Sequence, residues 1–183
     1  MKYDLPYTIE NGLGEKIIFK EIIHEPDGDK LIIQGFCHPG GGPAMHIHFK
    51  QDECFTVRKG KVGYQCLDGE EKFAAEGETL LFKRGTAHRF WNAGNDELQM
   101  DAWVKPADNL IFFLSTLYEA QRISGKGQPE RFYAAYLLTR YKKEYDMVGL
   151  PAFVKNVLLP VTYTFGKLFG KYKKFKEAPH PVE

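Results

Sequence analysis

The sequence predicts a mainly β domain, built as a small barrel, that is followed by a group of α-helices. Up to residue 105, short runs of β-branched and aromatic residues alternate with turn-forming glycine, proline and aspartate, a pattern typical of a β-sandwich or small barrel. Beyond residue 105, apolar residues recur at every third or fourth position, as they do on one face of a helix. We therefore expect a β-barrel over residues 1–105 and a helical C-terminal extension over residues 106–183.

The strands predicted for the first part are short and closely spaced. The segment 25–29 has the composition of a turn, and Asp68-Gly69 indicates a hairpin. The expected strands cover residues 15–24, 30–37, 54–58, 62–67, 71–75, 79–83, 88–92 and 98–104. Many short strands with turns between them favour a barrel over a long open sheet.

The second part predicts about three helices. The first is expected to begin near Leu110, with Asp108 as its cap, and to end at the glycine-rich segment 125–128. The second is expected to run from about Glu130 to Tyr145. The third covers residues 154–168, with a kink expected at Pro160 because proline interrupts helical hydrogen bonding.

Composition bounds the classes of protein to consider. The chain has 183 residues, is 43% hydrophobic and carries a net charge of +1, so it can fill one core and shows no overall bias toward nucleic acid. The helical part lacks a compact basic recognition element, so no nucleic-acid partner is expected. Cys37, Cys54 and Cys66 are odd in number and lack the spacing of a zinc ribbon or disulfide framework. Reduced cysteines and the absence of a signal-type apolar segment at the start predict a cytoplasmic location.

Four side chains offer the nitrogen and oxygen atoms that divalent metals bind. His46 and His48 are two residues apart, so on a strand both imidazoles point to the same face. Glu53 would enter from the start of the next strand, and His88 from a separate strand. This donor set suits one ion of iron, manganese, nickel, zinc or copper, without fixing which. Three imidazoles and one carboxylate leave about two positions free on a six-coordinate metal, where a small molecule can bind.

Two longer patterns surround these four residues. Gly40-x5-His46-x-His48-x4-Glu53-x6-Gly60 resembles the first motif of the cupin superfamily. The second motif of that superfamily is similar to Gly77-x5-Lys83-x-Gly85-x2-His88-x3-Asn92. The one departure is Lys83, where the family pattern has proline, a residue that shapes a turn and is not a ligand. The resemblance covers roughly residues 15–105, and the helical remainder lies outside it.

The resemblance implies a jelly-roll barrel with one divalent metal held by His46, His48, Glu53 and His88. It fixes no reaction, because proteins of one fold carry out many chemistries. The leading hypothesis is a metal-dependent enzyme acting on a small molecule, as an oxidoreductase of dioxygenase type or as an isomerase. The alternative is a non-catalytic module that binds or senses a small ligand. By analogy with the family, we expect a homodimer.

The third predicted helix lies in an unusually apolar segment. Between Met147 and Phe165 the only charged residue is Lys155, and a run of lysines follows. Pro151, Pro160 and Lys155 interrupt the segment, so a helix that spans a bilayer is not expected. Two interpretations remain. One is an interfacial helix at a membrane surface; the other, which the sequence favours, is a helix that packs on the barrel or across a dimer.

Overall fold

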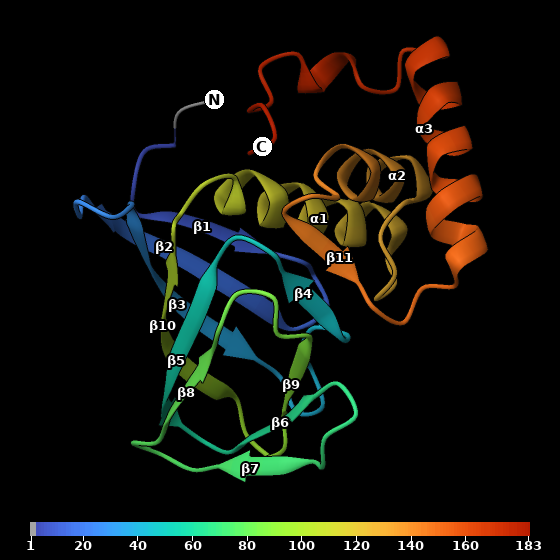
Figure 1. Ribbon diagram of the computed structural model, residues 1–183. Helices are drawn as coiled ribbons and strands as arrows, with labels where there is room; N and C mark the ends of the chain where they lie inside the picture. The colour runs from blue at the N-terminus through green and yellow to red at the C-terminus, as the bar shows by residue number, and fades with distance from the viewer. Residues whose placement is uncertain (1–2) are drawn as a thin grey trace.

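The computed structural model describes residues 3–183 and shows two antiparallel sheets with a layer of helices along one side (Figure 1). The six-stranded sheet has the order β1-β2-β3-β10-β5-β8, and the five-stranded sheet has the order β11-β4-β9-β6-β7. This arrangement confirms the predicted β-barrel with a helical C-terminal extension. It also shows that β11, a strand from the extension, belongs to the second sheet.

The observed strands follow the predicted ones closely, with three additions: β1, β11 and β4, the last implied only by the spacing of His46 and His48. The six-stranded sheet consists of β1 (Tyr7–Glu10), β2 (Glu15–Ile23), β3 (Lys30–Cys37), β5 (Asp52–Lys59), β8 (Thr79–Phe82) and β10 (Leu98–Lys105). The five-stranded sheet consists of β4 (His46–His48), β6 (Val62–Cys66), β7 (Lys72–Ala74), β9 (His88–Asn92) and β11 (Tyr145–Met147). Neither β1 nor β11 was predicted, because each is a short segment whose pairing partner supplies most of its stability.

The helical extension begins with α1 (Leu110–Ser124) and α2 (Arg131–Arg140). The prediction that Asp108 caps the first helix was wrong: Asn109 is the residue before α1, and Asp108 has a left-handed backbone with φ of 36°. The observed end of α1 agrees with the predicted end at the glycine-rich segment. Gly125 follows the helix with φ of 65°, a conformation that glycine adopts without strain.

The second helix is shorter than predicted. It ends at Arg140, whereas the apolar periodicity had suggested an end at Tyr145. Residues Tyr145–Met147 instead form β11, which pairs with β4 and places Tyr145 opposite His48 and Met147 opposite His46. Without β11, β4 would be an edge strand with unpaired backbone groups. Tertiary pairing therefore overrides the local helical preference.

The third helical segment is irregular at its start. A π-helical turn covers Val154–Leu158, and α3 (Leu159–Leu168) follows it directly. Pro160 lacks the N–H group that would bond to the carbonyl four residues earlier, which explains why the preceding turn is widened. A 3-10 turn at Lys173–Phe175 leads to the C-terminal residues. In the part of the chain described here, no helix has the length and apolar character needed to cross a bilayer.

Buried apolar side chains form two clusters. The first joins the two parts of the chain, since it includes Phe19 and Leu31 from the sheet and Leu110 and Tyr141 from the helical part. The second lies within the barrel and includes Phe55, Val57, Val62, Phe82 and Leu98. The three cysteines are free thiols, as expected.

Candidate metal centre

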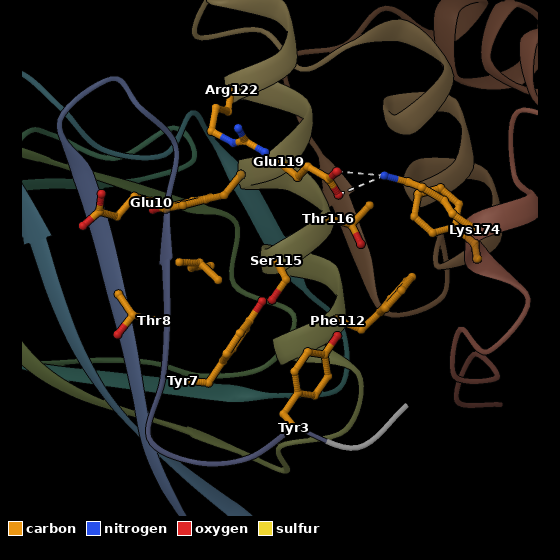
Figure 2. A pocket seen from close by; sticks show the side chains of 13 residues that line it. Tyr3, Tyr7, Thr8, Glu10, Phe112, Ser115, Thr116, Glu119, Arg122 and Lys174 are labelled. Carbon is orange, nitrogen blue, oxygen red and sulfur yellow. Dashed lines mark hydrogen bonds and ion pairs between the residues drawn. The ribbon is translucent and has the colours of Figure 1, made fainter.

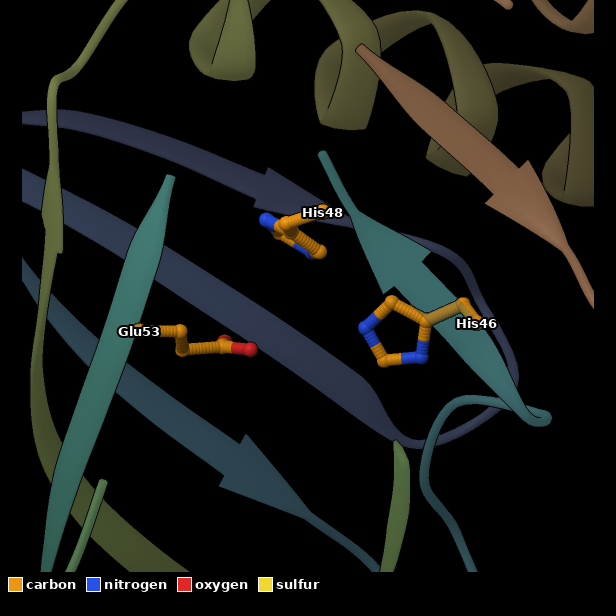
Figure 3. A group of neighbouring side chains, drawn as sticks. All are labelled: His46, His48 and Glu53. Carbon is orange, nitrogen blue, oxygen red and sulfur yellow. The ribbon is translucent and has the colours of Figure 1, made fainter. Parts of the chain in front are cut away.

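Three of the four predicted ligands form a compact group. His46 and His48 lie on β4 and Glu53 lies on β5, and one ligand atom of each lies within 4.8 Å of those of the other two. Figure 3 shows the Glu53 carboxylate extending from β5 toward the two imidazoles. Strand alternation explains how His46 and His48 reach the same region, as the spacing predicts.

His88 adjoins this group. It lies on β9 directly opposite His46, and the centroids of the two imidazole rings are 4.5 Å apart. Its Nε2 atom is 2.9 Å from Oε2 of Glu53, and the side chain is almost completely buried. The fold therefore brings all four predicted residues together, with His88 in contact with the carboxylate of the three-residue group.

Backbone carbonyls orient two of the imidazoles. Nδ1 of His46 lies 2.9 Å from the carbonyl oxygen of Ala44, and Nδ1 of His88 lies 3.0 Å from that of Thr86. A carbonyl oxygen can only accept, so both Nδ1 atoms carry hydrogen and donate it. The Nε2 atom of each ring is then the one that can bind a metal. In the metal-free protein, the hydrogen bond between Nε2 of His88 and Oε2 of Glu53 places a hydrogen between these two atoms, and a bound metal would take its place.

The third imidazole contains an unpartnered nitrogen. Nδ1 of His48 is buried and neither donates nor accepts a hydrogen bond among the described residues. Leaving a buried polar atom without a partner costs about 1–3 kcal/mol. A cation bound between the three residues would provide interactions that the protein alone does not, so the donor set fits a divalent metal.

The electrostatics of the group also suit a cation. Burial, together with the neighbouring His48 and His88, lowers the pKa of His46 to about 3, and burial lowers the pKa of His48. Burial opposes ionisation of Glu53, but the hydrogen bond with His88 and the nearby imidazoles outweigh it and lower the pKa of Glu53 to about 2. At neutral pH, His46 and His48 are therefore neutral and Glu53 is ionised, which are the protonation states that bind metals.

Asp52 holds the turn that precedes His88, a role for which the sequence contains no local signal. Its Oδ1 atom accepts from the backbone N–H of Arg84 at 2.8 Å, and its Oδ2 atom lies 3.4 Å from Nζ of Lys83. Gly85, with φ of 81°, continues the turn, and its N–H donates to the carbonyl of His48 at 2.7 Å. Asp52 thus stabilises the turn in which Lys83 replaces the proline of the cupin pattern.

Two aromatic side chains contact the candidate ligands. The ring of Phe82 stacks on the imidazole of His88, with centroids 4.0 Å apart and planes at 5°. The ring of Tyr145 meets the imidazole of His48 edge-on at 5.3 Å. Phe82 belongs to the apolar cluster inside the barrel and Tyr145 to the cluster shared with the helices. The candidate metal centre therefore lies between the two clusters, and neither contact was predicted.

A separate cavity lies between β1 and α1 (Figure 2). It has a volume of about 560 Å³, and its lining includes Tyr7, Ser115 and Arg122 together with the ion pair of Glu119 and Lys174, whose atoms are 2.9 Å apart. None of the four candidate metal ligands lines this cavity. It is therefore distinct from the metal centre.

Comparison with known proteins places the candidate centre in a family. The model of the cupin domain family matches residues 37–105, a segment that contains all four candidate ligands. The chain is 38% identical over 68 residues to a protein of Pestalotiopsis fici named "Oxidoreductase iacF", covering 36% of this chain and 33% of that protein. It is 30% identical over 67 residues to the "Probable oxidoreductase virH" of Hypocrea virens, covering 36% and 31%. The matched region thus spans about a third of each curated relative.

Among solved structures, the chain is similar to an uncharacterized protein of Klebsiella pneumoniae with a double-stranded β-helix domain. The identity is 23%, the match covers 49% of this chain and 76% of that one, and the TM-score is 0.41. The family match agrees with the two sequence motifs and with the observed antiparallel barrel. Residues 37–105 form a cupin domain.

Proposed function

We propose that this protein is a metal-dependent oxidoreductase that acts on a small molecule. One redox-active divalent ion of iron, manganese, nickel or copper would be held by His46, His48, Glu53 and His88. The observation that carries the proposal is the convergence of two imidazoles and a carboxylate within 4.8 Å, with His88 bonded to that carboxylate at 2.9 Å.

The type of donor atom supports a reactive centre more than a structural one. Structural zinc sites are normally closed by four ligands, often thiolates. Here the ligands are nitrogen and oxygen atoms, which suit metals that accept five or six ligands and leave positions for a substrate. A redox-active ion in this position would supply electron transfer to or from the bound molecule.

The names of the curated relatives support the class of reaction. Both carry the word oxidoreductase, and one of them is 38% identical to the matched part of this chain. The match spans about a third of each relative. What is proposed is electron-transfer chemistry at the cupin metal, on a substrate small enough to enter the barrel.

The protein's own residues would orient and shield this chemistry. The carbonyls of Ala44 and Thr86 fix the rings of His46 and His88, so that their Nε2 atoms face the centre. The stacked ring of Phe82 restricts rotation of His88 and keeps water from one side of it. A site built in this way holds its ligands in place before the substrate arrives.

The first experiment is elemental analysis of protein purified without chelator or affinity metal. We expect close to one equivalent of a single transition metal, and its loss in the His46→Ala and His88→Ala variants. His24→Ala is the matched control, because His24 is exposed and lies outside the cluster. The metal-loaded protein is then screened for consumption of oxygen or reduction of a dye with small organic substrates.

Two results would count against the proposal. If the wild-type protein neither contains metal nor takes it up, the four residues do not form a metal centre. If it binds one metal and retains a small molecule without converting it in any metal form, a non-catalytic binding module becomes the better description.

A further inference from the structure

A large apolar surface is exposed on the C-terminal helical segment. Seven large apolar side chains between residues 153 and 169 have exposed fractions from 44% to 74%. They are Phe153, Val157, Leu158, Val161, Phe165, Leu168 and Phe169. Their spacing of mostly three or four residues places them along one side of the helix, and we call this surface the α3 apolar face. Contiguous apolar patches of this kind usually mark an interaction site.

The opposite side of the helix is firmly packed. Tyr163 stacks on Tyr172 with ring centroids 5.4 Å apart, and Tyr136 of α2 packs against both rings. Gly166 is buried against Tyr172 so closely that a Cβ atom at this position would lie 2.3 Å from the phenol ring. These contacts fix the orientation of α3 on α2, at the outer side of the helical layer (Figure 1). The α3 apolar face is therefore held outward by the fold.

The charges around this face have one sign. From Met147 to Lys176 the sequence contains six lysines and no aspartate or glutamate. Lys155 pairs with Asp146 at 2.6 Å, and Lys174 pairs with Glu119 at 2.9 Å. Lys167, Lys171 and Lys173 take part in none of the ion pairs described for residues 3–183. The C-terminal end of the apolar face thus carries uncompensated positive charge.

We propose that the α3 apolar face binds the surface of an anionic lipid bilayer. The apolar side chains would enter the boundary between headgroups and acyl chains, and the three lysines would contact acidic headgroups. The positive charge at the end of the α3 apolar face disfavours a second copy of the chain as the partner that covers it. A second copy would offer the same lysines and no acid between Met147 and Lys176 to pair with them, whereas acidic lipids complement that charge directly.

The membrane-binding segment is joined closely to the candidate metal centre. Strand β11 ends at Met147, six residues before Phe153, and pairs with the strand that carries His46 and His48. The surface and the centre are thus linked through one short segment of chain. The proposal does not depend on the metal, because the exposed side chains and lysines are present without it.

The test is co-sedimentation of the full-length protein with vesicles of phosphatidylcholine alone and of phosphatidylcholine mixed with phosphatidylserine. The wild-type protein should bind the mixed vesicles at low salt and bind less at high salt. Replacing Lys167, Lys171 and Lys173 with glutamine should weaken binding about a hundred-fold, since each lysine near an anionic surface contributes roughly five-fold. The variant Phe165→Ser/Leu168→Ser/Phe169→Ser should lose binding.

Matched controls remove the same kinds of side chain elsewhere. Leu67→Ser/Leu81→Ser/Ile123→Ser replaces three exposed apolar residues outside the face, with exposed fractions of 50%, 48% and 51%. Lys20→Gln/Lys59→Gln/Lys72→Gln removes three exposed lysines of the barrel. Both controls should bind like the wild type, and circular dichroism should show that all four variants are folded.

Three outcomes would overturn the proposal. In the first, the wild-type protein does not bind the mixed vesicles at low salt. In the second, the triple serine variant of α3 binds the mixed vesicles as strongly as the wild-type protein does. The third is a wild-type dimer in sedimentation velocity that becomes a monomer in that variant, which would identify a second copy as the occupant. Metal-free protein is measured in parallel, so failure of the metal centre and failure of membrane binding give different results.

Discussion

Tyr145 lies directly opposite His48 in the antiparallel pair of β11 and β4, and its ring meets the imidazole edge-on with centroids 5.3 Å apart. The hydroxyl of the same tyrosine accepts a hydrogen bond from Nε2 of Gln51 at 3.1 Å. Both Tyr145 and Gln51 are buried. A residue of the helical extension therefore supports the strand that carries two candidate metal ligands.

Substitutions at Tyr145 should separate ring packing from hydrogen bonding. Tyr145→Phe keeps the ring against His48 but removes the nearer of the two acceptors of Gln51, the other being Oδ2 of Asp108 at 3.5 Å. It should reduce the free energy of unfolding by about 1–3 kcal/mol with little change in metal affinity. Tyr145→Ala removes the ring and should cost about 3–5 kcal/mol. It should also weaken metal binding roughly 10- to 100-fold, the usual effect of losing a group that orients a ligand.

Chemical unfolding of metal-free protein measures the free energy of unfolding of the Tyr145 variants. Competition with a chelator measures their metal affinity. Tyr118→Phe is the matched control, since Tyr118 is a buried tyrosine on α1 whose hydroxyl bonds Glu15 away from the centre. Wild-type metal affinity in Tyr145→Ala would show that the extension does not position His48.

The turn held by Asp52 offers a second test. Asp52→Ala removes the acceptor for the Arg84 N–H and the partner of Lys83, and should lower the free energy of unfolding by about 1–3 kcal/mol. Adding Lys83→Pro, the residue of the cupin pattern, should restore about 0.4–1 kcal/mol by restricting the unfolded chain. Urea unfolding of both variants measures these changes. If adding Lys83→Pro lowers the stability further, Asp52 does not replace the proline of the cupin pattern in stabilising the turn.

Much of the fold and the convergence of the candidate ligands could be predicted because both depend on local patterns. Strand alternation placed His46 and His48 on one face, and glycine marked the end of α1 at Gly125. Long-range contacts left no such pattern. The pairing of Tyr145 with His48 joins residues 97 positions apart in the chain, and the helical periodicity around Tyr145 concealed it.

The contacts of Asp52 show the same limit. This residue meets Arg84 only after β5 and β8 have paired. The sequence identifies Asp52 as an acid beside Glu53, but the turn that it holds is more than thirty residues away. The candidate ligands were therefore predictable as residue types at a given spacing, whereas the groups that orient them required the three-dimensional structure.

Metal should stabilise the folded protein by an amount that rises with the logarithm of the metal concentration. A ligand that binds only the native state at a hundred times its dissociation constant adds about 2.7 kcal/mol to the free energy of unfolding. Thermal unfolding with and without the metal found by elemental analysis should therefore show a higher Tm with metal. The shift should be absent in His46→Ala and present in the control His24→Ala. Equal shifts in both variants would mean that the ion binds outside the cluster.

Acid should destabilise the metal-free protein. The pKa of His46 is lowered to about 3 by burial and by the nearby histidines, and that of His48 is lowered by burial, whereas unfolded imidazoles titrate near 6.5. Below pH 6.5 the unfolded chain therefore binds more protons than the folded chain, and the free energy of unfolding decreases as the pH falls. The limit for each histidine is about 1.4 kcal/mol per pH unit.

Urea unfolding of chelator-treated protein between pH 7.5 and pH 5 measures this slope. Most of the window lies above the range in which Glu53 changes charge, because the pKa of Glu53 is lowered to about 2 and its unfolded value is 4.5. The His46→Gln variant removes one of the two imidazoles whose pKa is lowered and should show a shallower slope, while His24→Gln should match the wild type. A wild-type stability that stays constant from pH 7 to pH 5 would mean that His46 and His48 protonate as readily in the folded protein as in the unfolded chain, and that the cluster is open to water.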